Sequence, residues 1–132
     1  MLHNQREITI NNESFPVDVE LIELVEILNK KGYKTSGCCI GDYDSKDNAW
    51  VIIQENDEDN IVRLMQYLDC GYLLTKRMNY RKSENCLYCD YILETTKSEY
   101  NKRLQKIKYL VQDIKNIDSL KEYTIKTMEE RF

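Results

Sequence analysis

The stretch between Val19 and Ile53 constrains the fold of this chain more than any other part of the sequence. Its first half has apolar residues at helical spacing and ends at Gly32, a residue type that commonly follows the last turn of a helix. Residues 34–39 and 49–54 then have the composition of two strands, and an acidic loop joins them. This order predicts a helix that buries one face against a sheet.

Further elements are predicted on both sides of this stretch. Residues 6–10 predict a short first strand, and Asp18 is placed to cap the helix that follows it. The acidic run of residues 55–59 is expected to cap a second helix that continues through Leu68, and residues 72–80 and 87–93 predict a long hairpin.

Two C-terminal helices are predicted from spacings typical of a capping box, Thr96 with Glu99 and Ser119 with Glu122. The resulting order is β-α-β-β-α-β-β-α-α, and its first six elements match the ferredoxin-like, split βαβ arrangement. We therefore expect a single α+β domain over residues 1–132. It should contain a mostly antiparallel sheet, a β-hairpin and C-terminal helices.

The composition is typical of a globular chain, with 42% hydrophobic and 32% charged residues. No apolar run reaches the roughly 20 residues that span a bilayer, and the N-terminus lacks the apolar core of a signal peptide. We therefore expect a cytoplasmic protein with no membrane partner. Its five cysteines should then be reduced thiols.

Charge is distributed unevenly along the chain. Residues 1–66 carry 6 basic and 13 acidic side chains, whereas residues 67–132 carry 13 basic and 10 acidic ones. The acidic excess lies largely in two stretches, which contain Asp42, Asp44 and Asp47, and Glu55, Asp57, Glu58 and Asp59. These stretches predict a surface for a basic, nucleic-acid-binding partner, because complementary charge speeds association. The alternative is a pair of ordinary solvated loops.

The predicted hairpin combines basic and aromatic side chains, and its candidate ligand-binding residues are Lys76, Arg77, Tyr80 and Arg81. Arginine forks match phosphates and tyrosine rings stack on bases, so this cluster predicts a nucleotide or nucleic-acid site. The alternative is a polar strand whose lysines protect an open edge. Two copies of the chain could also pair along this edge as a homodimer. Basic residues of the following helix, including Arg103, are expected to form a solvated face.

Motifs for catalysis and metal binding are scarce. Cys86 and Cys89 have the spacing of half a zinc site, but a second half of the same form is missing. The neighbouring Cys38 and Cys39 would point to opposite faces of a strand. The only histidine, His3, lies in an N-terminus that we expect to be frayed, so it should not serve a cysteine as a base. We expect no catalytic residues, no enzymatic activity and no cofactor, with Cys86 and Cys89 as the alternative metal ligands.

The segment LNKKGYKTSGCCIG resembles small phage and prophage proteins of low-GC Gram-positive bacteria. In those proteins a helix that ends in LNxKGYxT leads through a Cys-x-Gly turn into a strand, and the resemblance covers residues 18–54. Many members read SCSGH where residues 38–42 of this chain read CCIGD, so no role of that histidine carries over. The resemblance implies a mobile-element origin and, for a phage protein, action in the host cytoplasm.

Three functions are compatible with these features. The first is a non-enzymatic binding protein of a phage or mobile element, which inhibits a host defence factor by covering a charged, nucleic-acid-binding surface, as an anti-CRISPR does. The second is a small-ligand binder that sequesters a nucleotide signal at the hairpin. The third is a cysteine-based zinc protein or an RNA-linked enzyme. The lack of a recognisable catalytic set favours the first.

Overall fold

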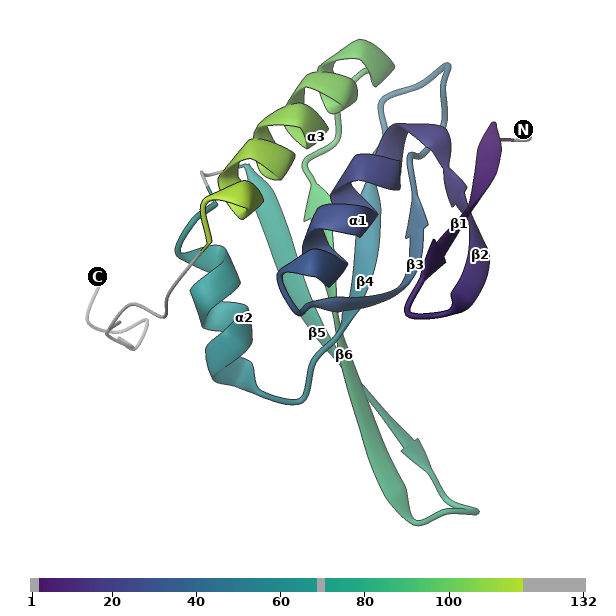
Figure 1. Cartoon of the computed structure of the whole chain (residues 1–132), viewed down its shortest axis with the longest axis vertical. Coiled ribbons are helices and arrows are strands. Elements are labelled where there is room, and N and C mark those ends of the chain that lie inside the picture. Colours follow the sequence, from purple (N-terminus) through teal and green to yellow (C-terminus); the bar gives the residue numbers. More distant parts are fainter. Residues whose placement is uncertain (1–2, 69–70, 118–132) are drawn as a thin grey trace.

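The computed structural model describes residues 3–68 and 71–117. Within these ranges, two antiparallel sheets and three α-helices form one α+β unit (Figure 1). The elements in chain order are β1 (Gln5–Ile10), β2 (Glu13–Asp18), a single 3-10 turn (Val19–Leu21), α1 (Ile22–Lys30), β3 (Lys34–Cys39), β4 (Trp50–Gln54), α2 (Glu58–Met65), β5 (Tyr72–Arg81), β6 (Cys86–Thr95) and α3 (Tyr100–Lys115). None of these helices is long and apolar enough to cross a membrane.

The first strand does not join the main sheet. Asn11 and Asn12 have φ values of 52° and 66°, and two consecutive positive φ values are typical of the tight turn that joins two hairpin strands. The turn folds β1 back onto β2, so these two strands form a separate sheet. The α+β class and the mostly antiparallel sheet are confirmed, but the ferredoxin-like start was wrong, because this turn pairs the first strand locally.

The first helix follows the sequence pattern closely. Gly32 has a φ of 96°, and the backbone N–H of Tyr33 donates to the carbonyl of Leu28 at 2.9 Å, which closes the last turn. Leu24, Val25 and Leu28 are all buried, Leu28 completely. The predicted helix end and buried face of α1 are therefore confirmed.

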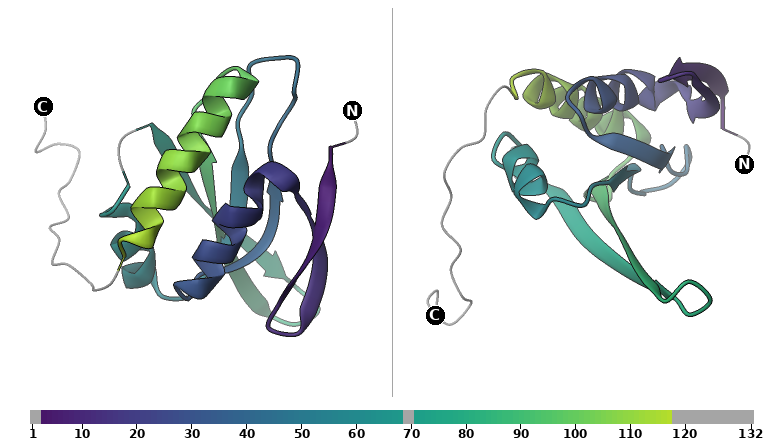
Figure 2. Two further views of the ribbon diagram at one scale, coloured as in Figure 1. Left: turned by 45° about the horizontal axis from the view of Figure 1, so that its top comes forward. Right: turned by 60° about the horizontal axis from the view of Figure 1, so that its bottom comes forward.

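The main sheet has the order β3-β4-β6-β5, and every neighbouring pair is antiparallel. One face of the sheet buries Val51, Ile53 and Leu93 in the core. Helices α1 and α3 pack side by side over this face (Figure 2). The core thus lies between a helical layer and the sheet.

Helix α3 begins later than the capping box predicts. Its N-cap residue is Glu99, whose side chain makes no capping hydrogen bond, and the Thr96 hydroxyl instead accepts a hydrogen bond from Lys106 Nζ at 2.6 Å. The predicted helix that follows Ser119 lies outside the described residues.

The long hairpin β5–β6 extends beyond the body of the molecule. Strands β5 and β6 are each ten residues long, but β4 pairs with β6 only over residues 91–94. The remaining part, residues 76–90, projects away from the helical layer (Figure 1). We call residues 76–90 the arm.

Candidate functional site

The first acidic stretch forms an ordered loop around the buried side chain of Arg103. This arginine comes from α3 and has 0% of its surface exposed. Its guanidinium donates to four backbone carbonyl oxygens, those of Ser98 at 3.0 Å, Ile40 at 2.6 Å, Ser45 at 3.0 Å and Asp42. The prediction of a solvated helix face was therefore wrong at Arg103, because the loop between β3 and β4 wraps over this position.

Two of the three predicted aspartates in this loop serve its own structure. Asp47 accepts hydrogen bonds from the backbone N–H groups of Asp42 at 2.9 Å and Asn48 at 2.8 Å. Asp42 in turn accepts one from the N–H of Asp44 at 3.0 Å. These bonds hold the pKa of both Asp47 and Asp42 below the usual aspartate range. Of the three, only Asp44 is exposed, whereas Asp42 and Asp47 are partly buried.

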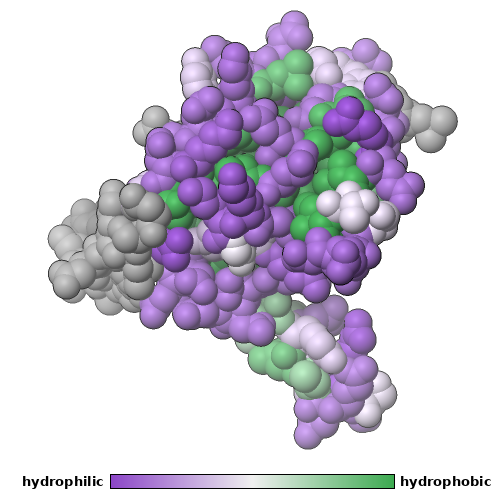
Figure 3. Space-filling model, in the orientation of Figure 1, coloured by the Kyte–Doolittle hydropathy of each residue, from purple (hydrophilic) through white to green (hydrophobic). Residues whose placement is uncertain are grey.

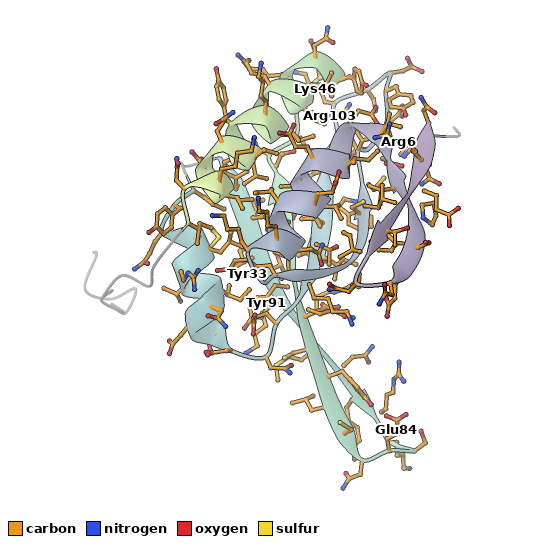
Figure 4. The ribbon with its side chains drawn as sticks, in the orientation of Figure 1. Arg6, Tyr33, Lys46, Glu84, Tyr91 and Arg103 are labelled. Carbon is orange, nitrogen blue, oxygen red and sulfur yellow. The ribbon has the colours of Figure 1, made fainter. Side chains whose placement is uncertain are left out.

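Gly41 allows the loop to approach the arginine. Its φ is +86°, and a Cβ atom there would lie 2.5 Å from the Asn48 carbonyl oxygen and 2.7 Å from Arg103 Nη1. Only glycine fits this backbone conformation and this space. Figure 4 shows Arg103 of α3 beside Lys46 of this loop. Both lie at the end of the molecule opposite to Glu84.

The second acidic stretch lies elsewhere. Asp57 caps α2 by accepting a hydrogen bond from the N–H of Asp59 at 2.9 Å, and Glu55 accepts one from the N–H of Asp57 at 2.9 Å. Asp57, Glu58 and Asp59 are exposed. Because the first stretch precedes β4 and the second follows it, the two lie at opposite ends of this strand (Figure 1). They do not form one acidic surface.

The arm has two chemically different faces. Side chains alternate between the faces of a strand, and residues that lie opposite each other in an antiparallel pair share a face. The register pairs Met78 with Cys89 and Tyr80 with Leu87, so these four side chains share one face. This face continues the one that buries Leu93 in the core. We call Met78, Tyr80, Leu87 and Cys89 the apolar arm face.

The apolar arm face is open to solvent. Met78 is 60% exposed, Tyr80 56% and Leu87 55%. Figure 3 shows hydrophobic residues on the part of the arm that extends beyond the body. In a sheet, a face with this composition is ordinarily covered, so its exposure identifies the arm as a candidate contact surface.

The opposite face of the arm is polar, and its charges are paired. Arg77 donates two hydrogen bonds to the Asp90 carboxylate, both at 2.8 Å, and Arg77 lowers the pKa of Asp90. Arg81 lies 3.7 Å from Glu84 and 4.8 Å from the centre of the Tyr88 ring. A groove of about 530 Å³ runs along this face, lined by Gln54, Arg77, Met78, Asn79, Arg81, Tyr88, Cys89 and Asp90.

The hairpin residues predicted to form one ligand site are therefore divided. Arg77 and Arg81 share the polar face, whereas Lys76 and Tyr80 lie on the other one. Lys76 Nζ lies 5.8 Å from the centre of the Tyr91 ring, near the base of the arm. The hairpin thus has a groove on its polar face, but the four predicted residues do not meet at a single site.

The register also separates the two cysteines of the arm. Cys86 lies opposite Arg81 and Cys89 lies opposite Met78, so the two cysteines face different sides of the hairpin. Their spacing of three residues would suit a turn, but both residues lie in β6. This arrangement does not bring them together as half of a metal site.

A cluster that the sequence reasoning missed joins the N-terminus to the end of β3. His3 Nδ1 lies 2.8 Å from Asp18 Oδ2 and 3.8 Å from Cys39 Sγ. The buried Asp18 carboxylate and the ring of Tyr43, whose centre lies 5.2 Å from that of the imidazole, hold His3 in place. The expectation that the chain is frayed at His3 was therefore wrong. Asp18 stands at the predicted N-cap position, before the 3-10 turn that leads into α1, but it is 1% exposed and its side chain makes no capping hydrogen bond.

The geometry of this cluster does not suit a nucleophile and its base. In such a set, the histidine uses one ring nitrogen for the carboxylate and the other for the thiol. Here Nδ1 is the atom near both Asp18 and Cys39. Burial and the nearby Asp18 charge raise the pKa of the Cys39 thiol, which opposes a reactive thiolate.

The only sequence signal for Arg103 was its position. It lies four residues before Ile107 and seven before Leu110, on the stripe that α3 buries. No comparable signal marked His3, Asp18 and Cys39, because the fold brings together residues that are distant in the sequence. Comparison of the chain with protein-family models, curated proteins and solved structures finds no match to any of them.

Proposed function

We propose that this chain is a non-enzymatic binding protein that docks a partner protein through its arm. The observation that carries the proposal is the apolar arm face, an extension of the core-facing side of the sheet that the body does not cover. The two paired strands of the arm place these side chains beyond the rest of the surface, where a groove on a partner could receive them.

The chemistry of the arm favours a protein over a nucleic acid. Methionine, tyrosine and arginine are enriched at protein interfaces, and buried aromatic or arginine anchors supply most of their energy. The apolar arm face contributes Met78 and Tyr80, and Arg77 and Arg81 lie on the other face with carboxylate partners. A nucleic-acid backbone would require unpaired cations, and both of these arginines already have an acidic neighbour.

The proposal keeps the first hypothesis from the sequence but changes its surface. Asp42 and Asp47 support their own loop, which leaves Asp44 and residues 57–59 as the exposed acidic groups of the two stretches. Those groups would affect the rate of association more than the affinity. The phage origin and the inhibition of a host defence factor stay predictions from the sequence.

Site-specific photo-crosslinking tests the proposal in cells. A photoreactive residue at position 87 reports on the apolar arm face, and one at position 44 reports on the acidic loop. We expect position 87 to trap a defined partner protein that mass spectrometry can identify. Position 44 should trap that protein weakly or not at all.

A matched pair of variants then separates the two arm faces. Met78→Glu places a charge on the apolar arm face, whereas Asn79→Glu places one next to it on the polar face. The first should reduce binding of the purified partner at least tenfold, because the introduced carboxylate must be desolvated. The second should bind as the wild type does. Equal binding by both variants, or crosslinking from position 44 alone, would contradict the proposal, and crosslinks only between copies would identify the arm as a dimer contact.

The groove on the polar face favours a second candidate function, the binding of a nucleotide. Arg77, Arg81 and Tyr88 line it, and they supply cations and a stacking ring. A phosphate would have to displace Asp90 from Arg77, which limits the affinity. Calorimetric titration with purine nucleotides tests this function, and Arg77→Ala and Arg81→Ala should abolish any heat of binding, whereas Leu87→Glu, outside the lining of the groove, should preserve it.

A further inference from the structure

The carboxylate of Asp18 is buried without a permanent positive charge beside it. It is 1% exposed, and among residues 3–68 and 71–117 its ion-pair partner is His3, which is charged only when protonated. A buried carboxylate is costly unless it is paired with a charge or binds a metal. This site is therefore suited to a cation that supplies the missing charge.

Three different donor atoms meet at this carboxylate. His3 Nδ1, Asp18 Oδ2 and Cys39 Sγ all lie within 4.8 Å of one another. Zinc bonds of about 2.0–2.3 Å at tetrahedral angles would place nitrogen about 3.6 Å from sulfur and about 3.3 Å from oxygen. The observed distances are 3.8 Å and 2.8 Å. These two distances differ from the tetrahedral values by about 0.5 Å or less, and the Asp18 oxygen and the Cys39 sulfur also lie within 4.8 Å of each other.

The groups around these donors already hold them in position. Asp18 accepts hydrogen bonds from Gln5 Nε2 at 3.0 Å and from the backbone N–H of Ile40 at 2.8 Å. The N–H of Gly41 donates to Cys39 Sγ at 3.3 Å, a bond that would strengthen to a thiolate. Surrounding hydrogen bonds of this kind orient the ligands of natural metal sites.

We propose that His3, Asp18 and Cys39 form a zinc site that fastens the N-terminus to the end of β3. A nitrogen, an oxygen and a sulfur donor suit zinc and related transition metals, whereas calcium and magnesium prefer oxygen alone. The cysteine would bind as a thiolate and release its proton to solvent, and the histidine would bind as the neutral ring. Three protein ligands leave a fourth position for water or for a donor from another molecule.

This inference does not depend on the arm or on the proposed function. The test uses the full chain without any affinity tag, since tag histidines would bind the same metals. Chelator-treated protein is titrated with Co²⁺, and absorption from thiolate-to-cobalt charge transfer reports on the sulfur ligand. Elemental analysis after Zn²⁺ loading and dialysis gives the stoichiometry. We expect one metal ion per chain by both measurements.

Single variants identify the ligands. His3→Ala and Cys39→Ser should weaken Zn²⁺ binding at least tenfold, as loss of a ligand does. Cys89→Ser on the arm is the matched control and should bind as the wild type does, as should Cys38→Ser beside the site. Circular dichroism of the metal-free variants checks the fold, so the test does not require an Asp18 variant that fails to fold.

A second measurement tests the fastening role. Saturating Zn²⁺ should raise the thermal midpoint of the wild type and leave that of Cys39→Ser unchanged, because a ligand stabilises only the state that binds it. Failure of the wild type to retain metal, full retention by Cys39→Ser, or loss of metal in Cys89→Ser instead would each overturn the proposal.

Discussion

The loop of residues 40–48 and the arm both stand out in the sequence as charged segments, but the fold uses their charges in opposite ways. In the loop, a buried arginine and two aspartates satisfy the backbone of the loop itself. In the arm, Arg77 and Asp90 pair on one face, and the other face exposes the apolar side chains of Met78, Tyr80 and Leu87. Charge in a sequence thus indicates a contact surface only where the charged groups are not already bound to their own chain.

We expect the largest effect on stability when Arg103, the arginine of α3 that the loop surrounds, is replaced. Arg103→Ala should lower the free energy of unfolding by about 3–5 kcal/mol, because several buried carbonyls lose their donor. Urea denaturation measures the change. Lys102→Ala, at an exposed position of the same helix, is the control and should change the stability by less than about 0.5 kcal/mol. A similar small loss for Arg103→Ala would mean that the loop does not depend on it.

The next effect tests the hydrophobic core of the body, to which neither the loop nor the arm is expected to be equivalent. Leu28 is completely buried in α1, so Leu28→Ala should cost about 2–5 kcal/mol through lost burial and a cavity. The same denaturation experiment measures it. A loss below about 0.5 kcal/mol, which is typical of surface positions, would mean that Leu28 does not face the core.

The third prediction concerns the acidic side of the loop. The pKa of Asp47 is lowered in the folded protein, so its charge contributes stability above the unfolded aspartate pKa of about 3.9. That contribution is lost as the pH falls through the lower folded pKa. Asp47→Asn should therefore cost about 1 kcal/mol at pH 7, and the difference from the wild type should vanish in acid. A difference that stays constant down to pH 2 would exclude the charge as its cause.

The smallest effect on stability is expected in the arm. Leu87→Ala should change the free energy of unfolding by less than about 0.5 kcal/mol, because Leu87 is 55% exposed and supports no core residue. A loss similar to that of Leu28→Ala would show that the arm is packed in solution. Sedimentation of the wild type would then identify whether a second copy covers it.

The local elements were predictable from the sequence, and the reasons are visible in single residues. Gly32 ended α1 as expected, and the apolar spacing of Leu24 and Leu28 marked its buried face. The hairpin of residues 72–95 was recognisable from its alternating strands. The position of β1 could not be predicted, because its strand pattern is compatible both with a local turn at Asn11 and Asn12 and with a longer connection into the main sheet.

The candidate sites were harder to predict, because their chemistry depends on register and on distant contacts. Tyr80 and Arg81 are neighbours in β5, so their side chains lie on opposite faces of the arm. The composition of the strand does not show which of these faces continues the core-facing side of the sheet. The partners Asp18 and Cys39 belong to different hairpins and meet only in the folded chain. Sequence spacing therefore indicated which residues could act, but not which of them act together.

The reach of Arg103 also bears on the order in which this chain folds. Its bond to the Ile40 carbonyl spans 63 residues, so the segment that it secures leaves the ribosome well before the arginine is made. Contacts with such sequence separation are slow to form, because a long loop must close first. The loop between β3 and β4 would therefore lack its hydrogen bonds to Arg103 until α3 packs against the sheet. A chain that ends before residue 103 could not form these hydrogen bonds.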